Sequence, residues 1–252
     1  MRKTPVPQKK RNTLTPMAAR RARKTLAGVV VVIDPGHGGA DPGAGRQNIW
    51  EAALTYRMAA TLAAVVRGLG AEVRYTVKSA ALRKPVSETH REPLLILPRD
   101  AVSKSGQPLH AGREAVEELH RRGDVAARAW KQARPHAVFV SLHFDVDSAP
   151  SASGGYPIYD TRAGLQPNRL VLLVSERFRS AGLAGNRGGH PHPRELGVLN
   201  PSHNPVPLKV LIELATLTNS EDRRKVQTAR WRWRTARIIA ACLVQCHKEK
   251  RL

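Results

Sequence analysis

Two histidines stand where apolar strands are expected to end. His37 follows the β-branched run 29–33 and lies in a loop, residues 34–45, whose five glycines and two prolines can continue neither a strand nor a helix. His143 follows a second apolar run, residues 137–142. Ligands of open α/β sheets bind just beyond the carboxyl ends of the strands, so both imidazoles are candidate site residues. The alternative for a single loop histidine is plain exposure to solvent.

Two glutamates add carboxylates to this set. Glu213 lies inside the strand-like run 209–214, where a buried carboxylate is costly unless a positive group faces it. A metal ion would serve as that positive group. Glu51 falls in the first turn of a helix predicted over residues 51–69. A carboxylate there also suits the helix dipole, so its position by itself leaves its role open.

The apolar periodicity places these residues in alternating strands and helices. At 252 residues, the chain has the length of one α/β domain. Helices are predicted over residues 51–69, 114–133, 170–181 and from the capping residue Asn219 onward, the last with one continuous apolar face through Leu243. Strands are predicted over residues 29–33, 71–77, 137–142, 156–159 and 209–214.

Two irregular stretches interrupt this pattern. Residues 78–110 carry prolines and charges around one apolar patch and are interpreted as an inserted segment, either a lid or a passive insertion. Further along, His190-Pro191-His192 resembles a metal-binding pair. An exposed turn is the better interpretation, because proline fixes a loop there and no carboxylate is suitably spaced.

Composition excludes several classes of protein. The hydrophobic content of 41% is that of a globular chain, and no run of 18 apolar residues is present to span a membrane. Cys242 and Cys246 are the two cysteines, four apart on one predicted helix. A disulfide framework and a four-cysteine zinc site are therefore both excluded.

The net charge of +22 is concentrated at the two ends of the chain. Residues 1–26 hold nine Lys and Arg and no acid, and residues 223–252 hold ten with Glu249 as the one acid, which leaves +4 between them. Such ends bind polyanions, although an arginine-rich composition without a specific partner is equally consistent. Residues 1–26 are predicted to be a disordered tail, and no apolar core of a secretory signal is visible in them.

Several separated segments carry a resemblance to a known family. They are Ile33-Asp34-Pro35-Gly36-His37-Gly38-Gly39 with Asp41-Pro42-Gly43, Glu51, Ser141-Leu142-His143, Gly197-Val198-Leu199, and Leu211-Ile212-Glu213 followed by Asn219 and Asp222. In this order, over residues 30–245, they resemble the zinc-dependent N-acetylmuramoyl-L-alanine amidases of bacterial cell-wall remodelling.

The resemblance implies both a fold and a site. The fold is a single α/β domain, residues 27–252, with a mixed, mostly parallel sheet and helices on both faces, phosphorylase/hydrolase-like. The site is one Zn²⁺ per chain held by His37, Glu51 and His143, with Glu213 as the catalytic acid/base. Two imidazoles and one carboxylate leave a tetrahedral position open for water, as catalytic zinc requires. Asp34 or Asp145 is a candidate for orienting a ligand imidazole, although a turn role is as consistent.

The implied reaction is hydrolysis of the amide between N-acetylmuramic acid and L-alanine in peptidoglycan. We therefore expect a monomer in the cell envelope, periplasm or extracellular space, with no transmembrane segment and no specific nucleic-acid partner. Its basic ends would contact anionic envelope polymers.

Three alternatives are weaker. A zinc carboxypeptidase would place its first two ligands in a His-x-x-Glu run, whereas His37 and Glu51 are fourteen residues apart. A non-catalytic peptidoglycan-binding relative would be expected to lack Glu213 or a ligand. A nucleic-acid-binding protein would explain the charge but not the polar residues at the strand ends.

Overall fold

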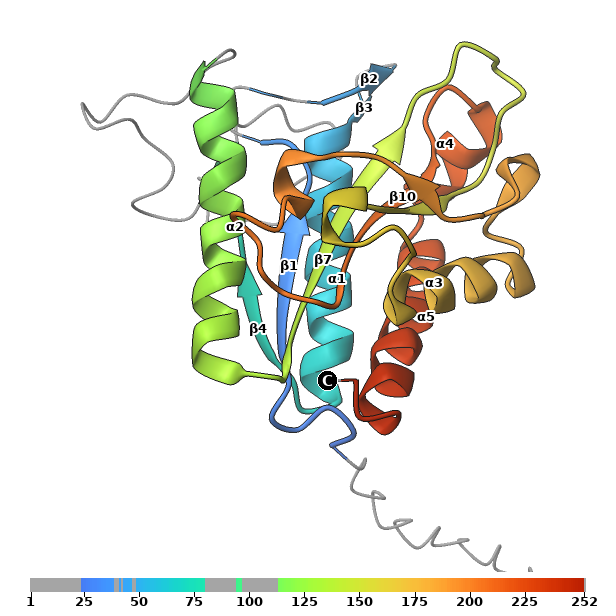
Figure 1. The fold of residues 1–252 in the computed structure, drawn as a ribbon. Coiled ribbons are helices and arrows are strands. Elements are labelled where there is room, and N and C mark those ends of the chain that lie inside the picture. Colours follow the sequence, from blue (N-terminus) through green and yellow to red (C-terminus); the bar gives the residue numbers. More distant parts are fainter. Residues whose placement is uncertain are drawn as a thin grey trace, which may run out of the picture.

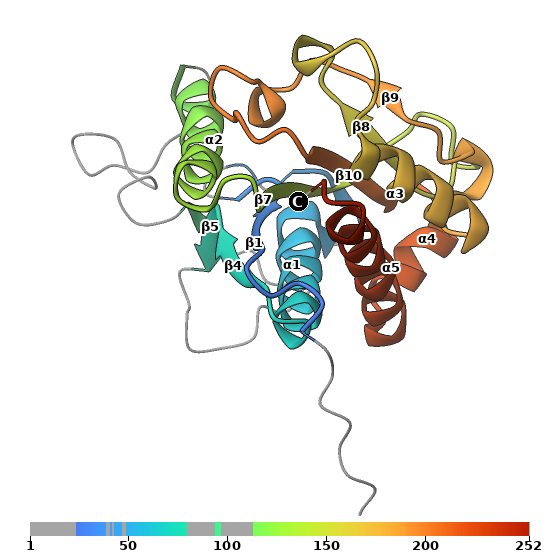
Figure 2. The ribbon, with the colours of Figure 1, turned by 60° about the horizontal axis from the view of Figure 1, so that its bottom comes forward.

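A six-stranded sheet forms the centre of the computed structural model, which describes residues 24–38, 41, 43–46, 49–79, 94–96 and 113–251. The strand order is β4-β1-β7-β10-β8-β9; Figure 1 labels β4, β1, β7 and β10, and Figure 2 labels β8 and β9. The four parallel strands are β4 (Glu72–Tyr75), β1 (Val30–Pro35), β7 (Ala137–Asp145) and β10 (Lys209–Thr216). Strand β8 (Tyr156–Tyr159) is antiparallel to β10, and β9 (His192–Pro193) is parallel to β8. The predicted mixed, mostly parallel sheet is confirmed.

Helices cover both faces of this sheet (Figure 2). One face packs against α1 (Glu51–Gly68), α3 (Arg169–Ser180) and α5 (Ala229–Lys248), and the other packs against α2 (Arg113–Ala133). Strand β1 supplies both cores, because Val31 and Ile33 face one side while Val30 and Val32 face the other. A strand buried on both faces is apolar throughout, which explains the unbroken run of valines.

Smaller elements complete the described fold. Strands β2 (Gly45–Arg46) and β3 (Ile49–Trp50) pair at the end of the glycine-rich loop, and β5 (Val77–Ser79) pairs with β6 (Leu94–Ile96). Single 3-10 turns occupy Thr161–Ala163, Gly185–Arg187 and Gly197–Leu199. Apart from β5 and β6, the predicted insertion at 78–110 lies outside the described residues. Within the described ranges, no helix is both long and apolar enough to cross a membrane.

The last predicted helix is in fact two helices. Asn219 caps α4 (Ser220–Val226) as predicted, since its side chain accepts hydrogen bonds from the backbone N–H groups of Glu221 and Asp222, both at 3.1 Å. The prediction of one continuous helix was wrong. A second helix, α5, begins after Thr228. The hydroxyl of Thr228 accepts a hydrogen bond from the N–H of Trp231 at 3.2 Å and so caps the N-terminus of α5.

The strand predicted over residues 71–77 is divided into β4 and the first residue of β5, and the boundaries at the basic tail and at β7 also differ from the prediction. Leu26, assigned to the basic tail, is fully buried, and its N–H donates to the carbonyl of Leu69 at 2.9 Å. The folded part therefore includes residues before 27, while residues 1–23 lie outside the described chain. Strand β7 continues to Asp145 instead of ending at Leu142, so His143 lies within the strand and its backbone is held by the sheet.

Candidate metal centre

Glycines make room for two imidazoles at the carboxyl edge of the sheet. A Cβ on Gly36 would lie 2.3 Å from ring atoms of His143, and a Cβ on Gly43 would lie 2.6 Å from the ring of His37. His37 itself has a φ of 62°, a left-handed conformation that is uncommon outside glycine. The glycine-rich loop is thus shaped around the two histidines.

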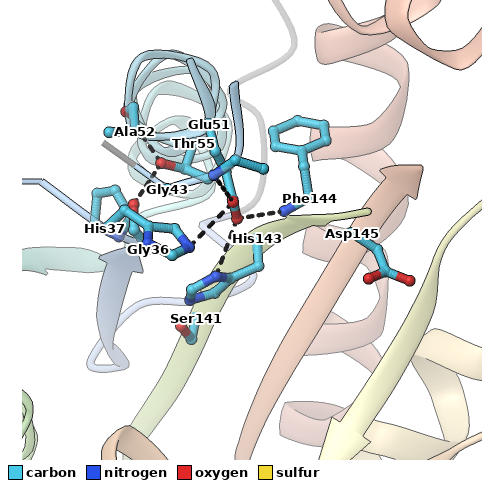
Figure 3. Close-up of polar contacts among 12 residues, drawn as sticks. Gly36, His37, Gly43, Glu51, Ala52, Thr55, Ser141, His143, Phe144 and Asp145 are labelled. Atoms are coloured by element: carbon cyan, nitrogen blue, oxygen red, sulfur yellow. Dashed lines mark hydrogen bonds and ion pairs between the residues drawn. The ribbon is translucent and has the colours of Figure 1, made fainter. Parts of the chain in front are cut away.

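Glu51, the first residue of α1, lies between the two imidazoles (Figure 3). Its side chain is 4% exposed. Oε1 accepts the N–H of Phe144 at 2.9 Å and lies 3.2 Å from Nδ1 of His143. Oε2 accepts the N–H of Ala44 at 3.0 Å and lies 3.1 Å from Nε2 of His37. Both carboxylate oxygens therefore point at an imidazole nitrogen.

In the part of the chain that the structure describes, one cluster of His, Cys, Asp and Glu side chains could hold a metal ion. It consists of His37, Glu51 and His143. Their ligand atoms lie within 4.8 Å of one another, and the two ring centroids are 4.9 Å apart. The three residues come from the loop after β1, the start of α1 and strand β7. Two imidazole nitrogens and one carboxylate are a donor set suited to zinc.

The charges of the cluster favour a cation at its centre. Burial disfavours a charged His37, but hydrogen bonds with Asp41 and Glu51 outweigh it and raise the pKa of His37 to about 10. Burial likewise opposes ionisation of Glu51, yet hydrogen bonds with His143 and His37 outweigh it and lower the pKa of that carboxyl. The site therefore holds an ionised carboxylate that attracts either imidazole protons or a metal ion that replaces them.

The carboxylate that orients a candidate ligand is Asp41, rather than Asp34 or Asp145. Oδ2 of Asp41 lies 2.8 Å from Nδ1 of His37, on the side of the ring away from Glu51. Asp145 instead forms an ion pair with Arg187 and lies apart from the cluster (Figure 3). A carboxylate on the far nitrogen fixes the tautomer and the orientation of an imidazole ligand. The position of Asp41 in the same loop, four residues after His37, was the available signal.

Glu213 lies beside this cluster. In the register of β10 with β7, Glu213 is paired with His143, and it is 8% exposed. Among the described residues, its buried Oε2 has no hydrogen-bond partner. Burial, and then the negative charge of Glu51, raise the pKa of Glu213 to about 8. A buried carboxyl with a free acceptor atom is suited to taking up a proton.

The second histidine pair does not join the metal-binding cluster described above. His190 and His192 are both exposed as predicted, but His192 lies in the short strand β9 rather than in a turn. Neither belongs to the metal-binding cluster found within the described ranges.

Sequence reasoning missed two residues that hold the ligand loop. The hydroxyl of Thr55 donates to the carbonyl of Gly36 at 2.8 Å, and the guanidinium of Arg122 donates to the carbonyl of His37 at 2.6 Å. A signal for Arg122 existed, because it occupies a position of the apolar stripe of α2. That stripe continues with Val125, Ala126 and Ala129.

Known proteins share this fold. An N-acetylmuramoyl-L-alanine amidase from Clostridium difficile 630 is 20% identical over 88% of this chain and 98% of that chain, with a TM-score of 0.63. The catalytic domain of CwlV, an N-acetylmuramoyl-L-alanine amidase from Bacillus (Paenibacillus) polymyxa var. colistinus, is 22% identical over 87% and 98%, with a TM-score of 0.61. The CwlD amidase of Clostridioides difficile, solved in complex with the GerS lipoprotein, is 18% identical over 88% and 99%, with a TM-score of 0.64.

At these identities the solved structures establish the fold. Among curated protein sequences, no significant match was found. The family model described as N-acetylmuramoyl-L-alanine amidase matches residues 31–245, which include every candidate site residue. The chain therefore belongs to the N-acetylmuramoyl-L-alanine amidase family.

Proposed function

We propose that this amidase is zinc-dependent and hydrolyses the amide bond between N-acetylmuramic acid and the L-alanine of the peptidoglycan stem peptide. His37, Glu51 and His143 are the zinc ligands, one ion is bound per chain, and Glu213 is the catalytic acid/base. The observation that carries the proposal is the convergence of two imidazoles and a buried carboxylate beside Glu213, whose buried Oε2 has no partner among the described residues.

The residues present fit a zinc ion. The cluster offers two nitrogens and one carboxylate oxygen from three separate elements, so a four-coordinate zinc held by these residues would have one position left for water. Glu51 is buried, and its ion pairs among the described residues are with His37 and His143, so a cation at this site would balance its charge. Zinc, when bound, polarises a water molecule and the substrate carbonyl.

Glu213 moves the proton in this scheme. It accepts a proton from the attacking water as the water oxygen bonds to the carbonyl carbon of the lactyl group. The same carboxyl then donates a proton to the nitrogen of L-alanine as the C–N bond breaks. Asp41 holds His37 in one tautomer throughout, since it contacts the ring nitrogen that faces away from Glu51.

The setting of the reaction follows from its substrate. Peptidoglycan lies outside the cytoplasmic membrane, so we infer that the protein acts in the cell envelope, the periplasm or the extracellular space. Daughter-cell separation and lysis are the processes that such a cleavage serves.

A digestion experiment tests the proposed function. Purified muropeptides are incubated with the protein, with and without a zinc chelator, and the products are identified by mass spectrometry. The expected products are peptides with a free L-alanine amino group and intact N-acetylmuramic acid, formed without chelator and absent with it. Cleavage at another bond, or cleavage that is indifferent to chelator, would refute the assignment.

Replacing Gly36 by alanine is expected to weaken zinc binding at least tenfold. The new Cβ would overlap the ring of His143 at 2.3 Å, so the imidazole must move away from its partners. Isothermal titration with zinc measures the change. Gly68→Ala is the matched control, because a Cβ there meets nothing within 4 Å. Equal zinc affinity in both variants would show that the imidazole needs no such clearance.

Deleting residues 1–23 is expected to weaken binding to isolated sacculi at low salt and to leave cleavage of a soluble muropeptide unchanged. The deletion removes eight basic residues and no acid, and it spares the buried Leu26. At about 1 M salt the Debye length is roughly 3 Å, so the difference in binding should vanish. Co-sedimentation at several salt concentrations measures it. If binding to sacculi and cleavage of the soluble muropeptide fall equally, residues 1–23 contribute to the fold or to the catalytic site.

A further inference from the structure

Three consecutive carbonyls of the ligand loop are held by side chains from two helices. One guanidinium nitrogen of Arg122, Nη1, donates to the carbonyl of Pro35 at 2.8 Å, and the other, Nη2, donates to that of His37 at 2.6 Å. Between them, the hydroxyl of Thr55 donates to the carbonyl of Gly36 at 2.8 Å. The backbone carbonyl of every residue from 35 to 37 therefore accepts a hydrogen bond from a helix side chain, and this backbone carries the His37 imidazole.

Arg122 is itself held in place by a buried carboxylate. Its Nη1 lies 2.9 Å from Oδ1 of Asp34, and the two residues are 2% and 0% exposed. Asp34 also accepts hydrogen bonds from the hydroxyls of Thr76 and Ser141, the latter at 2.6 Å. Burial opposes its ionisation, but the charge of Arg122 and these hydrogen bonds lower the pKa of Asp34. Both oxygens of the buried Asp34 carboxylate therefore accept hydrogen bonds, as a buried charge requires.

Asp34 connects β1, the strand that precedes His37, to β7, the strand that contains His143. Asp34 lies in β1, three residues before His37, and Ser141 lies in β7, two residues before His143. Asp34 and Ser141 are paired in the register of β1 with β7. One carboxylate therefore connects both strands to Arg122 of α2, and Arg122 in turn reaches the carbonyl of His37.

His37 needs such support because its φ of 62° is unfavourable for a residue with a side chain. We propose that Arg122, fixed by Asp34, is a positioning residue that holds the His37 loop in its metal-binding conformation. This inference rests on the proposed zinc site. This role requires the two terminal nitrogens of a guanidinium. A single ammonium group cannot reach the carbonyls of both Pro35 and His37 while it also contacts Asp34.

Arg122→Lys tests the inference with little change in charge or size. The zinc dissociation constant is expected to rise about 10- to 100-fold, as for other groups that orient metal ligands. The absorption spectrum of the Co²⁺-substituted variant should also change, because displacement of His37 alters the coordination geometry. Zinc affinity is measured by competition with a chelator, and folding is followed by circular dichroism and the melting temperature.

Arg162→Lys is the matched control. Like Arg122, Arg162 donates hydrogen bonds to a buried carboxylate and to a backbone carbonyl. These belong to Asp160 and Leu196. Asp160 follows β8, which runs antiparallel to β10, so this pair lies toward the other edge of the sheet. The control should keep the zinc affinity and the Co²⁺ spectrum of the unmodified chain, whatever it loses in melting temperature.

The outcomes separate the inference from the proposed function. An unmodified chain that binds no zinc overturns the zinc site and this inference with it. An unmodified chain that binds zinc, together with an Arg122→Lys variant that binds it equally well, overturns the inference alone. If Arg122→Lys does not fold, Ser141→Ala, which removes one hydrogen bond to Asp34, should raise the zinc dissociation constant several-fold. An unchanged constant in that variant overturns the inference.

Discussion

Glu213→Gln is expected to lower the rate of amide cleavage by about 10²- to 10⁴-fold while one zinc stays bound per chain. Glutamine keeps the size of the side chain and its hydrogen-bonding capacity, but it cannot accept a proton from water. The buried Oε2 of Glu213, which has no hydrogen-bond partner in the described part of the chain, is the atom that loses this ability. Single-turnover cleavage of a soluble muropeptide measures the rate, and elemental analysis measures the zinc.

Glu221→Gln is the control for this variant. Glu221 is exposed on α4 and pairs with Lys225 at 2.7 Å, so its replacement should change neither the rate nor the zinc content. Two results would show that the role given to Glu213 is wrong. Near-normal cleavage by Glu213→Gln would make the residue structural, and loss of zinc as complete as in a ligand variant would make it a ligand.

Replacing His37 and His143 together by alanine is expected to abolish zinc binding and amide cleavage at once. Glu51 would then be the one remaining member of the cluster, and a single carboxylate does not hold zinc against solvent. The unmodified protein, purified without added metal, should contain about one zinc per chain. Elemental analysis and the cleavage assay follow the two losses in parallel.

The exposed pair His190 and His192 supplies the control for the double replacement. Both side chains lie outside the candidate cluster, so His190→Ala with His192→Ala should retain zinc and activity. Zinc that persists after replacement of His37 and His143, or an unmodified protein without zinc, would contradict the metal centre described above.

Much of the fold could be predicted because buried parallel strands have a strong local signature. The apolar, β-branched run before His37 predicted β1, and the run before His143 predicted β7. Periodicity was less informative about the end of the chain. The apolar residues of the two segments recur in the sequence at a spacing that one helix could also carry, but the cap at Thr228 separates α4 from α5.

The sequence by itself determined which side chains come to the carboxyl edge of the sheet, because glycine and proline end a strand and parallel strands end together. His37 and His143 were identified from the ends of apolar runs, and Glu213 was identified as a carboxylate inside a strand-like run. Only the tertiary structure decided which groups contact them. Arg122 meets the carbonyl of His37 across 85 residues of chain, and this contact arises from the packing of α2 on β1. A local pattern reports the element that a residue belongs to, whereas its distant partners depend on how the elements pack.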